Sequence, residues 1–153
     1  IQANDLIGRK MAREGGATLQ AVIGMMRALD ADLAGQDGAN FAAIRSRFGV
    51  AIDALASAGE WIVANYGADV RAASSGAVPF LTLLGIVASG WQMVRAALIA
   101  QAKIDAGNSD PFYAAKVVTA RFYADHVLSQ AAGLASSIID GAEGVLALAE
   151  EMF

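Results

Sequence analysis

The chain has 153 residues, the length of one ordinary domain, and 56% of them are hydrophobic. Fifteen acidic and eleven basic side chains give a net charge of −4, without the basic stripe of a nucleic-acid binder, so we expect no nucleic-acid partner. The absence of cysteine excludes a disulfide framework, a thiolate metal site and a cysteine nucleophile. It suits a reducing compartment, and we expect a cytoplasmic protein.

Helical patterns separated by glycine-rich turns fill the first part of the chain. Residues 3–10 are expected to form a short helix end, and the two glycines at 15–16 then break the helical pattern. Apolar residues then recur every three or four positions over 18–34 and over 41–66, and each pattern predicts an amphipathic helix. The segment 35–38 between them predicts a turn.

The most apolar segment lies in the middle of the chain. The 23 residues 72–94 carry no formal charge, and a run of this length could span a bilayer. Polar side chains within the run, Pro79 near its start and a periodic pattern that continues past Arg95 to about Ala106 favour a buried helix of a bundle instead. We therefore expect no membrane partner, and a membrane-associated helical protein is the alternative.

The clearest break in the sequence is the segment 107–111 (GNSDP). Its glycine can end one helix, its aspartate can cap the next, and its proline suits the first helical position. A helix is then expected over 112–139. The pair 140–141 interrupts the chain, and a last helix is predicted to run to about Glu150.

Four principal helices with short connections predict an all-α fold, an antiparallel four-helix bundle with short extra helices at the ends. No strand-like alternation and no internal repeat is visible. Alanine or glycine on nearly every turn predicts a thin core that a few large side chains fill. The expected anchors of this core are Phe48, Trp61, Trp91, Phe122 and Tyr123.

No constellation of catalytic or metal-binding residues stands out. His126 is the only histidine, and a helix-surface histidine explains it better than a general base does. The glutamates lack the Glu-x-x-His spacing of di-iron bundles, so we expect no metal. The glycines form no phosphate-binding loop and the serines no nucleophile elbow, so we expect no catalytic residue.

Four cations lie on the two most regular predicted helices. They are Arg95, Lys103, Lys116 and Arg121. They could contact an anionic ligand such as a nucleotide phosphate, but pairing with carboxylates that sets the helix register is the favoured interpretation. The carboxylates considered are Glu60, Asp105 and Asp125. Arg121 also lies next to two aromatic residues and could instead face a partner domain.

Short motifs spread over the whole chain carry a family resemblance. They are Ile1-Gln2, Asp5-Leu6-Ile7-Gly8-Arg9-Lys10, Gly16-Ala17, Gly90-Trp91, Lys116, Ala120-Arg121-Phe122-Tyr123, Leu128 and Gly141-Ala142. The first two look like the sequence just after the Glu-Gly-Thr segment near the end of the acyl-CoA dehydrogenase catalytic core. The others resemble the extra C-terminal helical domain of the larger bacterial members, a subgroup that includes enzymes acting on long-chain and 3-methylthiopropanoyl-CoA substrates.

The resemblance implies a larger parent enzyme that uses FAD. In that family a glutamate removes the α-proton of an acyl-CoA, and a hydride passes to the flavin, which leaves a 2,3-enoyl-CoA. The resemblance places this glutamate before Ile1 and leaves Gln2 as the candidate for bordering FAD. It assigns 1–14 to the tail end of the core's last helix and 15–153 to a C-terminal accessory bundle.

This hypothesis makes the chain a packing or oligomer-interface domain. Its partners would be the catalytic core of the same polypeptide and further copies in a homo-oligomer, and the isolated chain would neither hold FAD nor turn over acyl-CoA. An excess of apolar residues over what the core can use predicts a contiguous apolar face. The structural or interface candidates are Trp61, Trp91, Arg95, Lys116, Arg121, Phe122 and Tyr123. A stand-alone helical interaction module is the other alternative.

Overall fold

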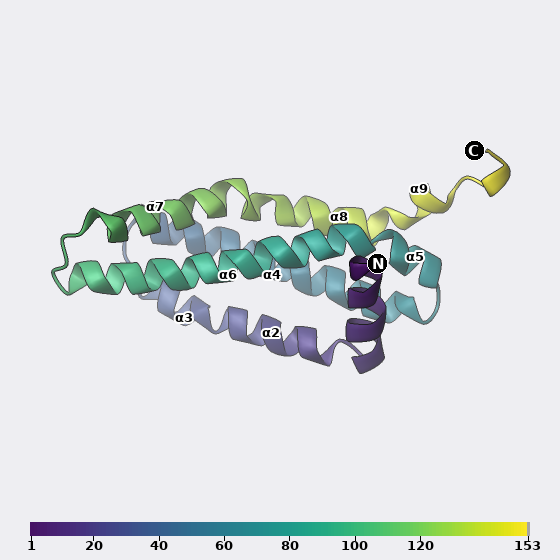
Figure 1. The fold of residues 1–153 in the computed structure, drawn as a ribbon, viewed down its shortest axis with the longest axis horizontal. Coiled ribbons are helices and arrows are strands. Elements are labelled where there is room, and N and C mark those ends of the chain that lie inside the picture. Colours follow the sequence, from purple (N-terminus) through teal and green to yellow (C-terminus); the bar gives the residue numbers. More distant parts are fainter. Residues whose placement is uncertain (153) are drawn as a thin grey trace.

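A computed structural model describes residues 1–152 of the chain, and within that range the protein contains helices and no strand (Figure 1). The all-α prediction is therefore confirmed. Four long helical columns lie along one another, and successive columns run in opposite directions (Figure 1). The columns are α2 (Ala17–Arg27) with α3 (Leu29–Ala34), α4 (Ala39–Tyr66), α6 (Ala77–Asp105), and α7 (Pro111–His126) with α8 (Ala131–Asp140).

The N-terminal residues form a helical segment that lies across one end of the columns (Figure 1). It consists of α1 (Gln2–Asn4), a π-helical stretch η1 (Asp5–Met11) and a 3₁₀ turn η2 (Ala12–Glu14). One side of it is buried, through Ala3, Ile7 and Met11. The predicted helix over 3–10 is thus longer than expected. It ends at Gly15 and Gly16, whose φ angles of 60° and 80° favour glycine.

Two predicted long helices are interrupted. The pattern over 18–34 forms two helices that meet at Ala28, and the pattern over 112–139 is broken after α7 by a 3₁₀ turn, η3 (Leu128–Gln130). The expectation of one continuous helix over 112–139 is therefore wrong. The turn places the buried side chain of Leu128 against Gly90 of α6, a close contact that helical periodicity alone does not reveal.

The start of α7 follows its predicted signals. Gly107 has a φ of 84° after the end of α6, Pro111 occupies the first helical turn, and the Asp110 carboxylate accepts a hydrogen bond of 2.9 Å from the Phe112 N–H. A cap of this kind satisfies an N–H that has no partner within the helix. A second aspartate cap, at Asp69, begins the short helix α5 (Val70–Ser75).

The predicted last helix is shorter than expected. After α8 the chain forms α9 (Ala142–Leu146), and a 3₁₀ turn η4 (Glu150–Met152) follows. This segment leaves the bundle (Figure 1), and none of the residues of α9 is buried. A helix of five residues without a buried face lacks the packing that stabilises most helices, so the prediction of a helix to about Glu150 is wrong.

Alanine supplies 12 of the 31 buried hydrophobic residues in the described part of the chain, as the alanine-rich prediction expects, but the other 19 are larger, so the prediction that only a few large side chains fill the core is wrong. The largest fully buried side chains are Phe48 and Phe80, and many of the others in the core are alanines. Of the expected anchors, Phe48 is buried, whereas Trp61, Trp91 and Tyr123 are only half-buried and pack at the edge of the core. Phe122 is 59% exposed, so its assignment to the core is wrong. It lies on the opposite side of α7 from the buried residues Val117, Ala120 and Ala124.

Helix α6 passes through the middle of the bundle and contacts α4, α7 and α8. It is the one helix in the described part of the chain that is long and apolar enough to cross a membrane, by length and composition only. The core helix of a soluble protein meets the same criterion. Its buried residues recur every three or four positions from Ala77 to Ala100, which is the pattern of a helix packed on one side.

Gly90 and Gly85 provide a matched test of close packing, since both lie in α6. A Cβ at Gly90 would lie 2.6 Å from Leu128 Cδ2, whereas a Cβ at Gly85 meets nothing within 4 Å. We expect Gly90→Ala to lower the free energy of unfolding by about 1–3 kcal/mol, because the buried leucine must move. Gly85→Ala should raise it by roughly 0.5–1 kcal/mol, because glycine weakens a helix interior.

Urea unfolding followed by circular dichroism measures both changes. Equal effects of the two substitutions would contradict the close contact between α6 and η3.

Candidate interaction surface and the α2–α4 pocket

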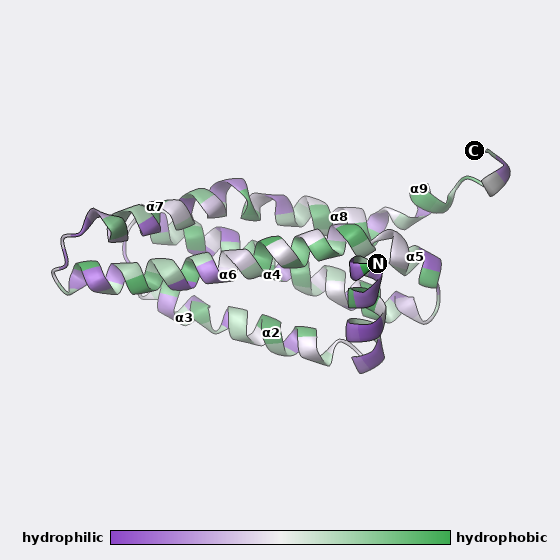
Figure 2. Cartoon of the chain, viewed as in Figure 1, coloured by the Kyte–Doolittle hydropathy of each residue, from purple (hydrophilic) through white to green (hydrophobic). Residues whose placement is uncertain are grey.

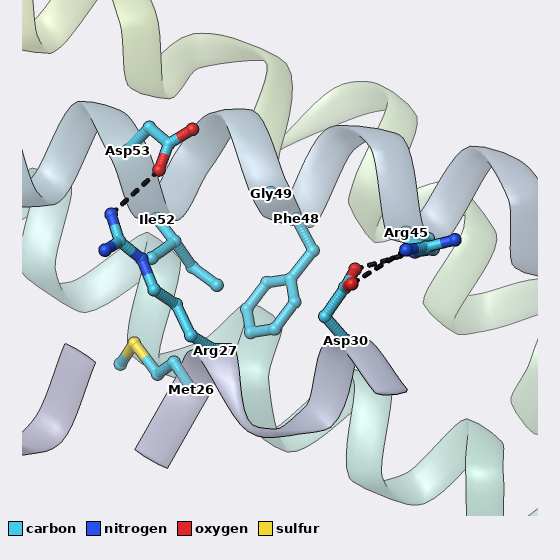
Figure 3. Close-up of a pocket in the computed structure, with 8 residues that line it drawn as sticks. All are labelled: Met26, Arg27, Asp30, Arg45, Phe48, Gly49, Ile52 and Asp53. Carbon is cyan, nitrogen blue, oxygen red and sulfur yellow. Dashed lines mark hydrogen bonds and ion pairs between the residues drawn. The ribbon is translucent and has the colours of Figure 1, made fainter. Parts of the chain in front are cut away.

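A cavity of about 290 Å³ lies between the first two columns (Figure 3). Phe48 and Ile52 of α4 line it with apolar side chains, and charged side chains lie at its two ends (Figure 3). Its full lining is Met26, Arg27, Asp30, Arg45, Phe48, Gly49, Ile52 and Asp53. The sequence alone did not reveal this pocket, because its residues come from three separate helices, α2, α3 and α4, and form no local motif.

Two ion pairs join α2 and α3 to α4 across this pocket (Figure 3). Arg45 donates to both carboxylate oxygens of Asp30, at 2.6 and 2.7 Å, and Arg27 donates to Asp53 at 2.9 Å. Hydrogen bonds from Arg45 lower the pKa of Asp30 below its ordinary value, and the same contact raises the pKa of Arg45. Since each of these two cations already has an anion, the arrangement holds α2 and α3 against α4 and leaves no unbalanced charge in the pocket lining for a ligand.

Arg121 lies at a contact between α7 and the start of α4. Its guanidinium pairs with Asp125 at 2.5 Å and donates to the backbone carbonyl of Ala39 at 3.0 Å. Of the three carboxylates considered for pairing, Asp125 is thus the one that Arg121 contacts. Asp125 belongs to α7 itself, so this pair lies within one helix. The hydrogen bond to Ala39 is the contact that joins α7 to the start of α4.

Arg95 and Lys116 contact aromatic rings instead. The Arg95 guanidinium lies 5.7 Å from the centre of the Trp91 ring and donates to Gln92, and the Lys116 ammonium lies 4.9 Å from the centre of the Phe112 ring. Cation–π contacts of exposed residues contribute about 0.5–1 kcal/mol. Within the residues that the structure describes, neither cation is paired with a carboxylate.

The half-buried aromatic residues hold the edges of the core. Tyr123 of α7 donates its hydroxyl proton to the Ile86 carbonyl of α6 at 3.0 Å, which joins these two columns. Trp61 belongs to α4, and its carbonyl accepts a hydrogen bond from Asn65. The indole N–H of Trp91 is buried and has no partner among the described residues. Leaving a buried donor unpaired costs about 1–3 kcal/mol.

The remaining candidates lie at the surface. Gln2 is exposed at the start of α1. His126 is exposed, and its ring stacks on Phe122 with the ring centres 4.4 Å apart, as expected of a helix-surface histidine. Within the part of the chain that the structure describes, no group of three or more histidine, aspartate or glutamate side chains could hold a metal ion.

An uncharged strip of exposed residues runs along the first half of α6, and we call it the α6 strip. Its members recur every three or four positions, so they share one side of the helix. They are Val78, Leu81, Thr82, Gly85, Ser89 and Gln92. Hydrophobic and neutral residues predominate along this part of α6 (Figure 2). The strip contains polar hydroxyl and amide groups as well, so it is mixed rather than wholly apolar.

Comparison with known proteins assigns the chain to a family. A family model described as "Acetyl-CoA dehydrogenase C-terminal like" matches residues 16–149, most of the chain. The chain belongs to this C-terminal family. The match begins at the glycine pair that separates the N-terminal segment from α2.

One relative of this family extends well beyond the matched region. The chain is 38% identical over 146 residues to 3-methylmercaptopropionyl-CoA dehydrogenase of Ruegeria pomeroyi (strain ATCC 700808 / DSM 15171 / DSS-3). The match covers 95% of this chain and 25% of the relative, so the chain spans about a quarter of that protein's length. The similarity supports the family assignment that the short motifs indicated.

The Asp30–Arg45 pair predicts a pH-dependent contribution to stability. Because the folded state lowers the pKa of Asp30, the pair stabilises the fold fully above the ordinary aspartate pKa of 3.8. This contribution is lost as the pH falls through the lower pKa of the folded state. We expect Asp30→Asn to lower the melting temperature near neutral pH. The difference in melting temperature from the unsubstituted chain should disappear at strongly acidic pH and become smaller in high salt.

Asp32→Asn is the matched control, because Asp32 also lies in the first turn of α3 but has no ion pair among the described residues. Thermal unfolding by circular dichroism over a pH series measures both. A gap for Asp30→Asn that is independent of pH, or equal to that of Asp32→Asn, would contradict the role of the pair.

Proposed function

We propose that the chain is the C-terminal accessory domain of an FAD-dependent acyl-CoA dehydrogenase, and that the α6 strip packs against the catalytic part of the same polypeptide. The parent would oxidise an acyl-CoA to a 2,3-enoyl-CoA, and this chain would supply packing surface. The exposed, uncharged α6 strip carries the proposal. The family match and the chain's share of the R. pomeroyi relative, about a quarter, support it.

The position of the N-terminal segment supports the choice of surface. Both α1 and η1 pack against α6, and the N-terminus lies beside the first half of that helix (Figure 1). Polypeptide that precedes Ile1 in the parent would therefore meet α6 next to the strip. Val78, within the strip, is 67% exposed. Covering such residues removes apolar area from water at no cost in desolvating charge.

The cavities of this chain do not fit an enclosed flavin. The α2–α4 pocket, at about 290 Å³, is at the lower limit for a small-ligand site, and its guanidinium and carboxylate groups bind one another. A groove around Ile1, Asn4 and Tyr66 is larger, about 560 Å³, but open to solvent. We therefore derive no catalytic step from these residues, and FAD would be held by the parent's other parts. Gln2 is the one residue proposed to border it.

A membrane-associated protein is the second candidate, because α6 is long and apolar enough to cross a bilayer. In that case α6 would leave the bundle and expose its contacts with α4, α7 and α8. Expression in the soluble fraction without detergent, with a helical spectrum and cooperative unfolding, separates the two candidates.

Substituting Val78 tests whether the α6 strip is covered in the parent. Val78 is exposed and lies in the first turn of α6, where a carboxylate suits the helix dipole, so Val78→Asp should change the stability of the isolated chain by less than about 0.5 kcal/mol. In the full-length polypeptide the same substitution buries a charge at an interface. We expect it to destabilise by about 2 kcal/mol or more.

Thermal unfolding of both proteins, followed by circular dichroism and by flavin fluorescence of the parent, measures these changes. Val50→Asp is the control, because Val50 is similarly exposed on α4, away from the strip. Equal effects of Val78→Asp in the isolated chain and in the parent would contradict packing through the strip. A purified parent that lacks flavin and acyl-CoA oxidation would contradict the proposed activity.

A further inference from the structure

The turn between α3 and α4 contains a pair of residues that can react with each other. Aspartate followed by glycine occurs twice in the chain, at Asp37–Gly38 and at Asp140–Gly141. In such a pair the backbone nitrogen of the glycine can attack the side-chain carboxyl carbon of the aspartate, because glycine has no side chain to hinder the approach. In a folded protein, the freedom of the local backbone decides whether the two atoms can meet.

The backbone around Asp37 is free to move. Asp37 is exposed and lies outside any helix. Among the described residues, neither its N–H nor the N–H of Gly38 donates a backbone hydrogen bond, and its carboxylate forms no ion pair. Gly38 has a φ of 95° and a ψ of 159°, a conformation that favours glycine. The turn can therefore change its shape without breaking a helix.

The backbone around Asp140 is held by helical structure instead. Asp140 is the last residue of α8, and the Gly141 carbonyl accepts a hydrogen bond of 3.3 Å from the Val145 N–H. A Cβ at Gly141 would overlap the Ser137 carbonyl, so the previous turn of the helix packs closely against this glycine. To bring the reacting atoms together, Asp140 would have to leave its helical conformation and break hydrogen bonds of the last turn of α8.

We propose that Asp37 is a site of spontaneous isomerisation and that helix α8 protects Asp140. The Gly38 nitrogen forms a bond to the side-chain carboxyl carbon of Asp37. The nitrogen loses its proton and the carboxyl group loses its hydroxyl, which leave together as water and give a succinimide ring. Water then opens the ring at either carbonyl. One opening restores aspartate, and the other gives isoaspartate, in which the main chain runs through the side-chain carbon. The net reaction consumes no other reactant and leaves the mass unchanged.

The product changes the connection next to a contact between two columns. Isoaspartate adds a carbon atom to the main chain just before Gly38 and Ala39. The Ala39 carbonyl accepts the hydrogen bond of 3.0 Å from Arg121 of α7. A displaced start of α4 weakens this contact, so we expect the isomerised chain to melt at a lower temperature.

The proposal does not rest on the proposed function. The α3–α4 turn lies at the opposite end of the bundle from the N-terminal segment (Figure 1), and it shares no residue with the α6 strip. Either proposal can therefore fail alone.

Asparagine at the two positions compares the two backbones under the same chemistry. It forms the same succinimide faster, releases ammonia instead of water, and so changes the mass of the chain. In native buffer we expect Asp37→Asn to deamidate at least tenfold faster than Asp140→Asn, as followed by mass spectrometry. In concentrated urea the two rates should be similar, because neither pair is then held by a helix. Similar rates in native buffer would overturn the proposal.

Storage of the unsubstituted chain in warm, mildly acidic buffer provides the second readout. Peptide mapping with electron-transfer dissociation should find more isoaspartate at position 37 than at position 140. Asp37→Glu is the matched variant, because it keeps the charge but would have to close a larger ring, and its melting temperature should not fall during storage. Isoaspartate no more abundant at position 37 than at position 140 would overturn the proposed site. Isoaspartate at position 37 without a lower melting temperature would overturn the proposed effect on the contact with Arg121.

Discussion

Close approach of helices at small residues is the constraint on which the rest of this structure depends. At Gly90 no side chain fits between α6 and Leu128, and at Gly59 a Cβ would overlap Leu19. Fully buried alanines occupy many of the other helix contacts. A close-packed interior of this kind leaves little room for added volume, so even one extra methyl group at these glycines would displace a neighbouring side chain.

Polar contacts at the edges of the core also join the columns to one another. Arg45 and Arg27 join α3 and α2 to α4, Arg121 joins α7 to α4, and the Tyr123 hydroxyl joins α7 to α6. These charged groups are occupied with structural contacts. The chain's surfaces, rather than its pockets, are therefore where we propose its function.

The sequence predicted the architecture well and the surface poorly, for physical reasons. Turn and cap signals such as Gly107 and Asp110 act locally, so they can be read from neighbouring residues, and helical periodicity located the columns. Which side of α7 faces the core depends on packing against α6 and α4. The sequence alone therefore could not show that Phe122 is exposed rather than buried. The same holds for the break at Leu128 and the pairing of Asp30 with Arg45, both of which arise from residues far apart in the chain.

The proposed function depends on the α6 strip being covered by the rest of a larger dehydrogenase polypeptide. Hydroxyl-radical footprinting of the full-length polypeptide and of this chain, read by mass spectrometry, tests it most directly. We expect Val78 and Leu81 to be oxidised several-fold more slowly in the full-length protein, while Val50 on α4 reacts similarly in both. Equal oxidation of the strip in the two proteins would contradict it.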